Sequence, residues 1–109
     1  MNGFRGGFGG QNMQSIMRQA QKMQEDLEKA QKELEQTQVV GSAGGEMVKV
    51  TMNGKKEFIS ISLKREAVDP DDVEMLEDLI SAAMLDASKK AEELSQDKLG
   101  SFGNLGGLM

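Results

Sequence analysis

The chain has 109 residues, a formal net charge of −5 at pH 7, and no Cys, His, Trp or Tyr. This composition excludes disulfides, metal sites built from thiolate or imidazole groups, and catalysis by Cys or His. A chain this short buries only about 60 to 70% of its unfolded surface, so self-association is an expected way to enlarge the core. We therefore expect one domain that is not an enzyme and has no metal site, no cofactor and no small-molecule substrate.

The charges are segregated along the sequence. Residues 1–24 carry three basic residues and no acid, and residues 39–65 carry five basic residues and two acids. Residues 25–38 and 66–109 are acidic, with net charges of −3 and −8. The overall acidity argues against a polyanionic partner, but the basic segments leave surfaces that a polyanion can bind.

The sequence predicts a cytoplasmic protein that does not enter a membrane. No apolar run approaches the length of about 18 residues that a membrane-spanning helix needs. The first residues also lack the pattern of a signal peptide.

Residues 1–11 are predicted to be a disordered arm. They are rich in glycine and offer too little apolar surface to offset the entropy lost on ordering. Arg5 lies between Phe4 and Phe8, which weakly resembles segments that bind nucleic acid by charge and stacking. A plain flexible tail is the alternative interpretation.

From Asn12, a residue that can cap a helix, the sequence predicts a long helix to about Gln38. Apolar or small residues recur there at alternating spacings of three and four, which is a heptad pattern. We expect part of this seam to form a homodimer interface, consisting of Ile16, Ala20, Met23, Leu27, Ala30 and Leu34. Packing of the same helix on its own domain is the alternative.

Residues 46–63 alternate with a period of two around Asn53-Gly54, the pair that favours a two-residue type I′ hairpin turn. That turn would place Val48 opposite Ile59 and would gather the apolar side chains of both strands on one face.

A short strand and a glycine loop precede this hairpin. The strand is expected at residues 37–40 and the loop at residues 41–45. The sequence therefore predicts a three-stranded antiparallel sheet.

A second long helix is predicted to follow, with Asp69 as its N-cap and Pro70 at its first position. Its apolar stripe is expected to cover the apolar face of the hairpin and consists of Leu76, Leu79, Ile80, Ala83, Ala87, Ala91 and Leu94. Gly100 marks the end of the helix, and residues 100–109 are expected to be a flexible tail. Residues 12–99 thus form a single α-β-β-β-α domain of the α+β class.

The acids early in this helix, Glu74, Glu77 and Asp78, suit the positive end of the helix dipole. A structural and solvated role for them is favoured over a metal or acid-base site, because no His lies among them.

Four stretches in this order resemble the YbaB/EbfC family of bacterial nucleoid-associated, DNA-binding proteins. They are the glycine-rich start, MRQAQKMQ at residues 17–24, GEMVKVTMNG at residues 45–54, and DVEMLEDLISAA at residues 72–83. Each stretch alone is weak evidence for the family, but the four in this order are specific, and they span nearly the whole chain.

The resemblance implies a homodimer with long projecting helices that binds double-stranded DNA at the nucleoid and organises it or regulates genes. It also implies recombination-repair proteins as further partners. Some relatives carry basic residues on the second hairpin strand, where this chain has Ile59 and Ser60. This departure shifts the expected DNA contacts to the arm, the first helix and the hairpin turn.

We therefore expect phosphate contacts from five cations, with the acidic second helix facing away from DNA. These candidate DNA-binding residues are Arg5, Arg18, Lys22, Lys55 and Lys56. The alternative for the cations is that they only solvate exposed faces. The alternative function, of another class, is a coiled-coil adaptor or assembly factor without intrinsic DNA binding.

Overall fold

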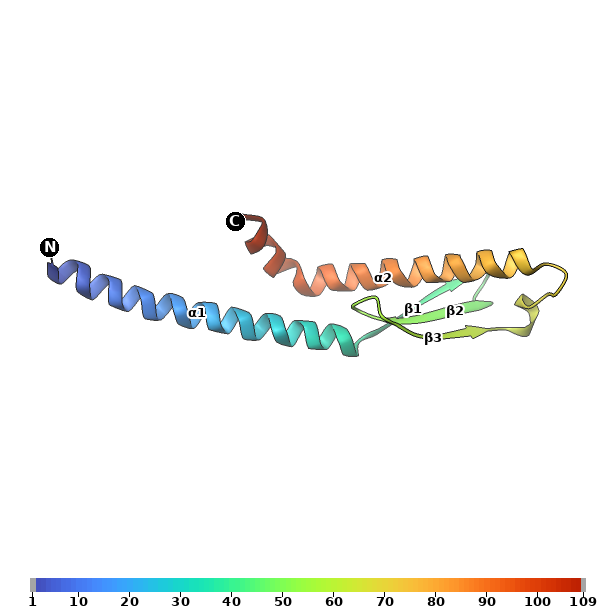
Figure 1. The fold of residues 1–109 in the computed structure, drawn as a ribbon, viewed down its shortest axis with the longest axis horizontal. Coiled ribbons are helices and arrows are strands. Elements are labelled where there is room, and N and C mark those ends of the chain that lie inside the picture. The colour runs from blue at the N-terminus through green and yellow to red at the C-terminus, as the bar shows by residue number, and fades with distance from the viewer. Residues whose placement is uncertain (1, 109) are drawn as a thin grey trace.

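The computed structural model describes the backbone of residues 2–108 and the side-chain surroundings of residues 12–100 and 102. The chain forms a helix, a three-stranded antiparallel sheet and a second helix, which confirms the predicted α+β fold. The elements are α1 (Asn2–Gln36), β1 (Gln38–Ala43), β2 (Val48–Asn53), β3 (Phe58–Leu63), the short 3-10 helix η1 (Arg65–Ala67) and α2 (Val73–Leu108). The molecule measures 84 × 22 × 16 Å, because α1 extends away from the sheet while α2 runs along it (Figure 1).

The core lies between α2 and one face of the sheet. The strands lie in the order β1-β2-β3, and α2 packs on β1 and β2. Val48 and Val50 of β2 are fully buried against Ala83 and Ala87 of α2. The predicted apolar stripe of α2 therefore does face the sheet, as the helical spacing of its apolar residues predicts.

Gly41 allows this close packing. A β-carbon at position 41 would lie 2.2 Å from the backbone nitrogen of Ala87 and 2.4 Å from the carbonyl oxygen of Ala83. The sequence predicts a loop at Gly41, but the residue lies inside β1. A glycine is needed at this position of the strand because only a residue without a side chain fits beneath the helix. The loop itself follows β1, where Gly44 and Gly45 have φ values of 64° and 63°.

The hairpin register differs from the predicted one. Val48 pairs with Leu63 rather than with Ile59, and Val50 pairs with Ile61. Because the shift is even for these pairs, Val48, Val50, Ile61 and Leu63 keep the face that the sequence predicts for them. An irregularity between Thr51 and Met52 changes the register by one residue and brings Phe58 opposite Met52.

The register shift reflects a longer turn that docks on the end of α1. Lys56 has a φ of 66°, and the turn closes through a 3.0 Å hydrogen bond from the backbone N–H of Asn53 to the carbonyl of Glu57. The N–H of Gly54 donates to the carbonyl of Leu34 at 2.8 Å. This contact satisfies a carbonyl at the C-terminal end of α1, so tertiary docking overrides the local preference for a type I′ turn.

β3 is left uncovered, contrary to the expectation that α2 would cover the apolar face of both hairpin strands. All six residues of β3 are exposed, with Ile61 at 41% and Leu63 at 40% exposed. A helix is about 10 Å wide and strands lie about 4.8 Å apart, so one helix covers about two strands.

The start of α2 also differs from its predicted position. Asp72, not Asp69, is the N-cap, because its Oδ1 atom accepts a 3.1 Å hydrogen bond from the backbone N–H of Met75. The backbone N–H of Asp72 donates to the carbonyl of Asp69, so Asp69-Pro70 begins a turn that precedes the helix.

The helices extend beyond the predicted domain limits of residues 12 and 99. α1 begins at Asn2 and α2 ends at Leu108. Gly100, predicted to end the second helix, lies inside α2 instead. The side chains of residues 1–11, 101 and 103–109 lie outside the described residues, so the disordered arm at residues 1–11 and the flexible tail at residues 100–109 stay predictions. Across the part of the chain that the structure describes, no helix is long and apolar enough to cross a membrane.

Candidate nucleic-acid interface

Arg18 and Lys22 form one exposed basic pair on α1. They lie one turn apart on the same side of the helix and line a shallow hollow with Gln19, Gln21 and Glu25. Neither cation takes part in an ion pair with the side chains described for residues 12–100. Both charges are therefore available to a bound anion. Arg5 belongs to the same helix, but its side chain lies outside the described residues.

The second basic pair lies at the hairpin tip, which we define as residues 53–57. Asn53 is buried, with only 6% of its surface exposed. Its Nδ2 atom donates to the carbonyl of Glu35 at 3.2 Å and to Oε1 of Glu57 at 2.7 Å. Its Oδ1 atom accepts from the backbone N–H groups of Lys55 and Glu57. The backbone of the tip is thus fixed against the end of α1.

Both lysines of the hairpin tip are paired with carboxylates of their own chain. Nζ of Lys55 lies 2.8 Å from Oε1 of Glu35 on α1, and Nζ of Lys56 lies 2.8 Å from Oε2 of Glu92 on α2. The hydrogen bond and the positive charge of each lysine lower the pKa of its glutamate partner. The expectation that the acidic second helix faces away from the candidate interface is wrong for Glu92.

The two basic pairs are separated along the molecule. Lys22 and Glu35 lie on the same helix, and a rise of 1.5 Å per residue places them about 20 Å apart along its axis. The structure therefore brings Lys55 and Lys56 together at the hairpin tip, and Arg18 and Lys22 together on α1, but does not merge the two pairs into one patch.

Two further ion pairs involve α2, and one of them joins it to α1. Lys98 of α2 pairs with Glu33 of α1, and Lys90 pairs with Asp86 at 3.3 Å within α2. Asp86 also accepts a 2.9 Å hydrogen bond from the backbone N–H of Ser42 on the edge strand β1. That bond, together with Lys90, lowers the pKa of Asp86.

The side chains of the predicted dimer seam become less exposed from the start of α1 to its end. Ile16 is 58% exposed, and Ala20 and Met23 are also exposed. Leu34, at the other end, is only 1% exposed and lies against Gly54 of the hairpin tip. Between them, Leu27 and Ala30 are half-buried.

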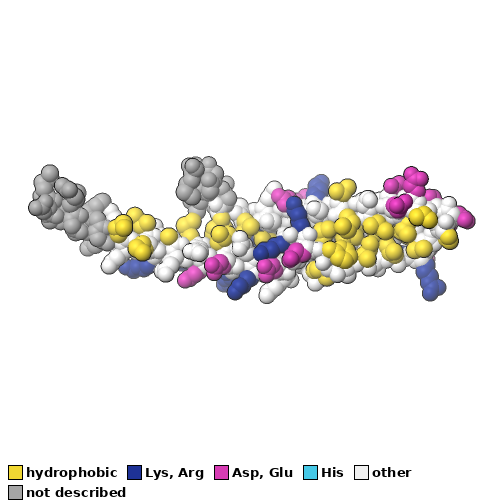
Figure 2. Space-filling view, in the orientation of Figure 1, with side chains coloured by type: hydrophobic (Ala, Val, Ile, Leu, Met, Phe, Trp, Pro, Cys, Tyr) yellow, Lys and Arg dark blue, Asp and Glu magenta, His cyan; other side chains and the backbone are white. Residues whose placement is uncertain are grey.

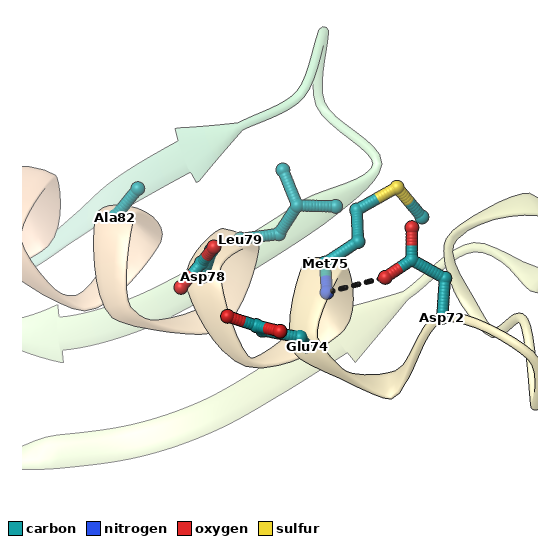
Figure 3. A pocket seen from close by; sticks show the side chains of 6 residues that line it. All are labelled: Asp72, Glu74, Met75, Asp78, Leu79 and Ala82. Atoms are coloured by element: carbon teal, nitrogen blue, oxygen red, sulfur yellow. Dashed lines mark hydrogen bonds between the residues drawn. The ribbon is translucent and has the colours of Figure 1, made fainter.

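Acidic side chains line a hollow at the start of α2 (Figure 3). Asp72 points toward the backbone nitrogen of Met75, while Glu74 lies in the first turn of the helix and Asp78 about one turn further on. Within the described residues, no three carboxylates or other ligating groups gather closely enough to hold a metal ion. The capping hydrogen bond gives Asp72 a structural role.

Glu35 and Glu92 are the residues that sequence reasoning missed at this site. Their pairing with the tip depends on the end of α1 and the middle of α2 meeting at one turn, which no local pattern encodes. The only sequence signal is that Glu35 lies close to the predicted end of its helix.

Comparisons with known proteins agree on the fold and the family. Residues 9–107 match the model of the YbaB/EbfC DNA-binding family. A nucleoid-associated protein of Clostridium botulinum is 54% identical over 97% of this chain and 96% of its own length. Another, from Ruminiclostridium cellulolyticum, is 52% identical over 94% of this chain and 90% of its own length. The crystal structure of an uncharacterized Helicobacter pylori protein is similar in fold, with a TM-score of 0.67, 22% identity, and coverage of 83% of this chain and 92% of the other.

Proposed function

The chain belongs to the YbaB/EbfC DNA-binding family, and from this membership we propose that it binds double-stranded DNA as a homodimer, mainly through phosphate contacts. Its role is to organise the nucleoid or to regulate genes, and its location is the nucleoid within the cytoplasm. It acts by binding and not by catalysis.

The exposed pair Arg18 and Lys22 is the observation that carries this proposal. Both cations lie on one side of a helix that extends beyond the compact half of the molecule (Figure 1). Since neither cation is ion-paired with a described side chain of residues 12–100, both can neutralise phosphates without breaking a described ion pair. Arg5 on the same helix, and Lys55 and Lys56 at the hairpin tip, add further phosphate contacts.

Exposed apolar surface supports the homodimer. The apolar side chains of β3 lie uncovered beside α2, and hydrophobic side chains gather over the half of the molecule that holds the sheet (Figure 2). The exposed end of the α1 seam, at Ile16 and Met23, is a second apolar surface. Exposed apolar surface marks sites of association, and we propose that a second copy covers both of these surfaces. A dimer also doubles the number of cations that meet one duplex.

The test is a titration of labelled duplex DNA with the purified protein at about 50 and about 200 mM salt. We expect affinity to fall steeply with salt. The double charge reversal Arg18→Glu with Lys22→Glu should weaken binding at least about tenfold, because it removes phosphate contacts and adds repulsion.

The matched control is the charge reversal Lys29→Glu with Lys32→Glu, which changes the net charge equally in the acidic part of the same helix. We expect it to weaken binding much less. Equal losses for the two double variants would contradict the placement of the interface at Arg18 and Lys22.

A protein-interaction adaptor is the second candidate, favoured by the exposed Ile16, Met17 and Met23 on α1. Sedimentation and gel-shift experiments on the same sample separate the two functions. A dimer that binds no DNA at either salt concentration would support the adaptor and overturn DNA binding.

A further inference from the structure

The two ion pairs of the hairpin tip join three separate elements at one turn. Lys55 is held by Glu35 of α1, and the next residue, Lys56, is held by Glu92 of α2. Each lysine therefore has a carboxylate from a different helix at 2.8 Å, in the position that a phosphate oxygen would take.

The hairpin tip cannot escape these carboxylates by moving its backbone. Asn53 is buried and hydrogen-bonded to the end of α1, and the N–H of Gly54 donates to the carbonyls of both Leu34 and Thr37. Any exchange of partners must therefore take place at the side chains of the two lysines.

Such an exchange is sterically open. The side chains of Lys55 and Glu35 are 35% and 50% exposed, and those of Lys56 and Glu92 are 47% and 49% exposed. Exposed ion pairs are weak because water and salt screen them, so a phosphate can replace the carboxylate without unfolding the tip.

We propose that Glu35 and Glu92 compete with DNA for the two lysines of the hairpin tip and thereby limit the affinity of the protein. This inference rests on the proposed DNA binding and assigns a regulatory role to the two acids that pair with the lysines of the hairpin tip. DNA approaching the protein meets a tip that is already neutralised, so first contact falls to Arg18 and Lys22, which form no ion pair with the side chains described for residues 12–100. Once the duplex is held there, the high local concentration of phosphate drives the exchange at the tip.

Removing the competitors should therefore strengthen binding. In the double variant Glu35→Gln with Glu92→Gln, the tip lysines keep their positions but lose their charged partners. Each exposed pair lowers the affinity by a factor of about five at most, so we expect a gain of roughly 2- to 10-fold for the double variant.

The control is the double variant Glu28→Gln with Glu93→Gln. It changes the net charge by the same amount, on the same two helices, at exposed residues that form no ion pair with the side chains described for residues 12–100. Both double variants and the unaltered protein are titrated with the same labelled duplex at one salt concentration, after circular dichroism has verified the helix content.

A clearly larger gain for Glu35→Gln with Glu92→Gln than for the control supports the competition. The gain should disappear when Lys55→Gln and Lys56→Gln are added. Equal gains, or a loss of affinity, would overturn the inference while leaving DNA binding intact. Absence of binding by all of these proteins would instead overturn the proposed function, and this inference with it.

Discussion

The hairpin tip and the outer part of α1, residues 12–26, carry the same kind of charge in opposite settings. At the tip, Lys55 and Lys56 sit on a fixed backbone and are both paired. On the outer part of α1, Arg18 and Lys22 are exposed beside uncovered apolar residues, and neither is ion-paired among residues 12–100. The contrast shows that counting basic residues is not enough to compare two candidate DNA-binding surfaces, because a lysine already paired with a carboxylate must give up that partner before it binds a phosphate.

Substitutions at the two ends of the α1 seam are expected to give the largest difference in stability between the hairpin tip and the outer part of α1. Replacing Leu34, which is 1% exposed, with Ala should cost about 2 to 5 kcal/mol of unfolding free energy, because it leaves a cavity beside the hairpin tip. Ile16→Ala, at a site that is 58% exposed, should change the stability of the protomer by about 0.5 kcal/mol or less.

Urea denaturation followed by circular dichroism measures both effects. The effect of Leu34→Ala should not depend on protein concentration, whereas that of Ile16→Ala should appear only where the dimer forms. A large, concentration-independent effect of Ile16→Ala would contradict the division of the seam into a buried and an exposed end.

Gly54→Ala tests how firmly the hairpin tip is docked. A β-carbon at position 54 would lie 2.7 Å from Cδ2 of Leu34 and 2.9 Å from its carbonyl oxygen. We expect a loss of about 1 to 3 kcal/mol in unfolding free energy, because the tip must move away from α1.

Gly100→Ala is the matched control, since nothing lies within 4 Å of the added carbon. It should stabilise α2 by up to about 1 kcal/mol, because alanine is the better helix former. Thermal unfolding of the two variants gives the comparison. A neutral Gly54→Ala would mean that the tip is not held against α1.

Acid pH should weaken the ion pairs of the hairpin tip, and this is the smallest effect expected. The folded protein lowers the pKa of Glu35 and Glu92 below the ordinary value of 4.5, chiefly through hydrogen bonds from Lys55 and Lys56. These groups therefore contribute stability above pH 4.5 and lose it as the pH falls through their folded pKa values.

Urea midpoints measured from pH 7 down to pH 3 test this prediction. Glu35→Gln with Glu92→Gln should flatten the decline in stability between about pH 5 and about pH 3, while Glu28→Gln with Glu93→Gln should not. If the stability of the Glu35→Gln with Glu92→Gln variant falls with pH as steeply as that of the unaltered protein, the two ion pairs of the hairpin tip do not stabilise the fold.

The sequence was sufficient for the order of elements and the faces of the strands. Period-two alternation placed Val48 and Val50 on the core face, and that placement survived an even error in register. The α2 stripe at Ala83 and Ala87 was equally clear, because helical spacing is a local property.

What could not be predicted depends on elements that meet far apart in the sequence. Asn53-Gly54 has the composition of a type I′ turn, yet its hydrogen bonds go to the end of α1. Which strand stays uncovered could not be foreseen either, since one helix covers about two strands and the choice between them depends on tertiary packing. The pairing of Lys56 with Glu92 likewise depends on α2 lying close to the hairpin tip.

The salt dependence of DNA binding tests the central claim most directly. The slope of log affinity against log salt should be measured for the unaltered protein and for two neutralised variants, Arg18→Gln with Lys22→Gln and Lys55→Gln with Lys56→Gln. Each lost phosphate contact reduces the slope by about 0.9. We predict a lower affinity and a shallower slope for the α1 variant, with a smaller loss of affinity for the tip variant. An α1 variant with the affinity and slope of the unaltered protein would contradict the placement of DNA binding on the outer part of α1.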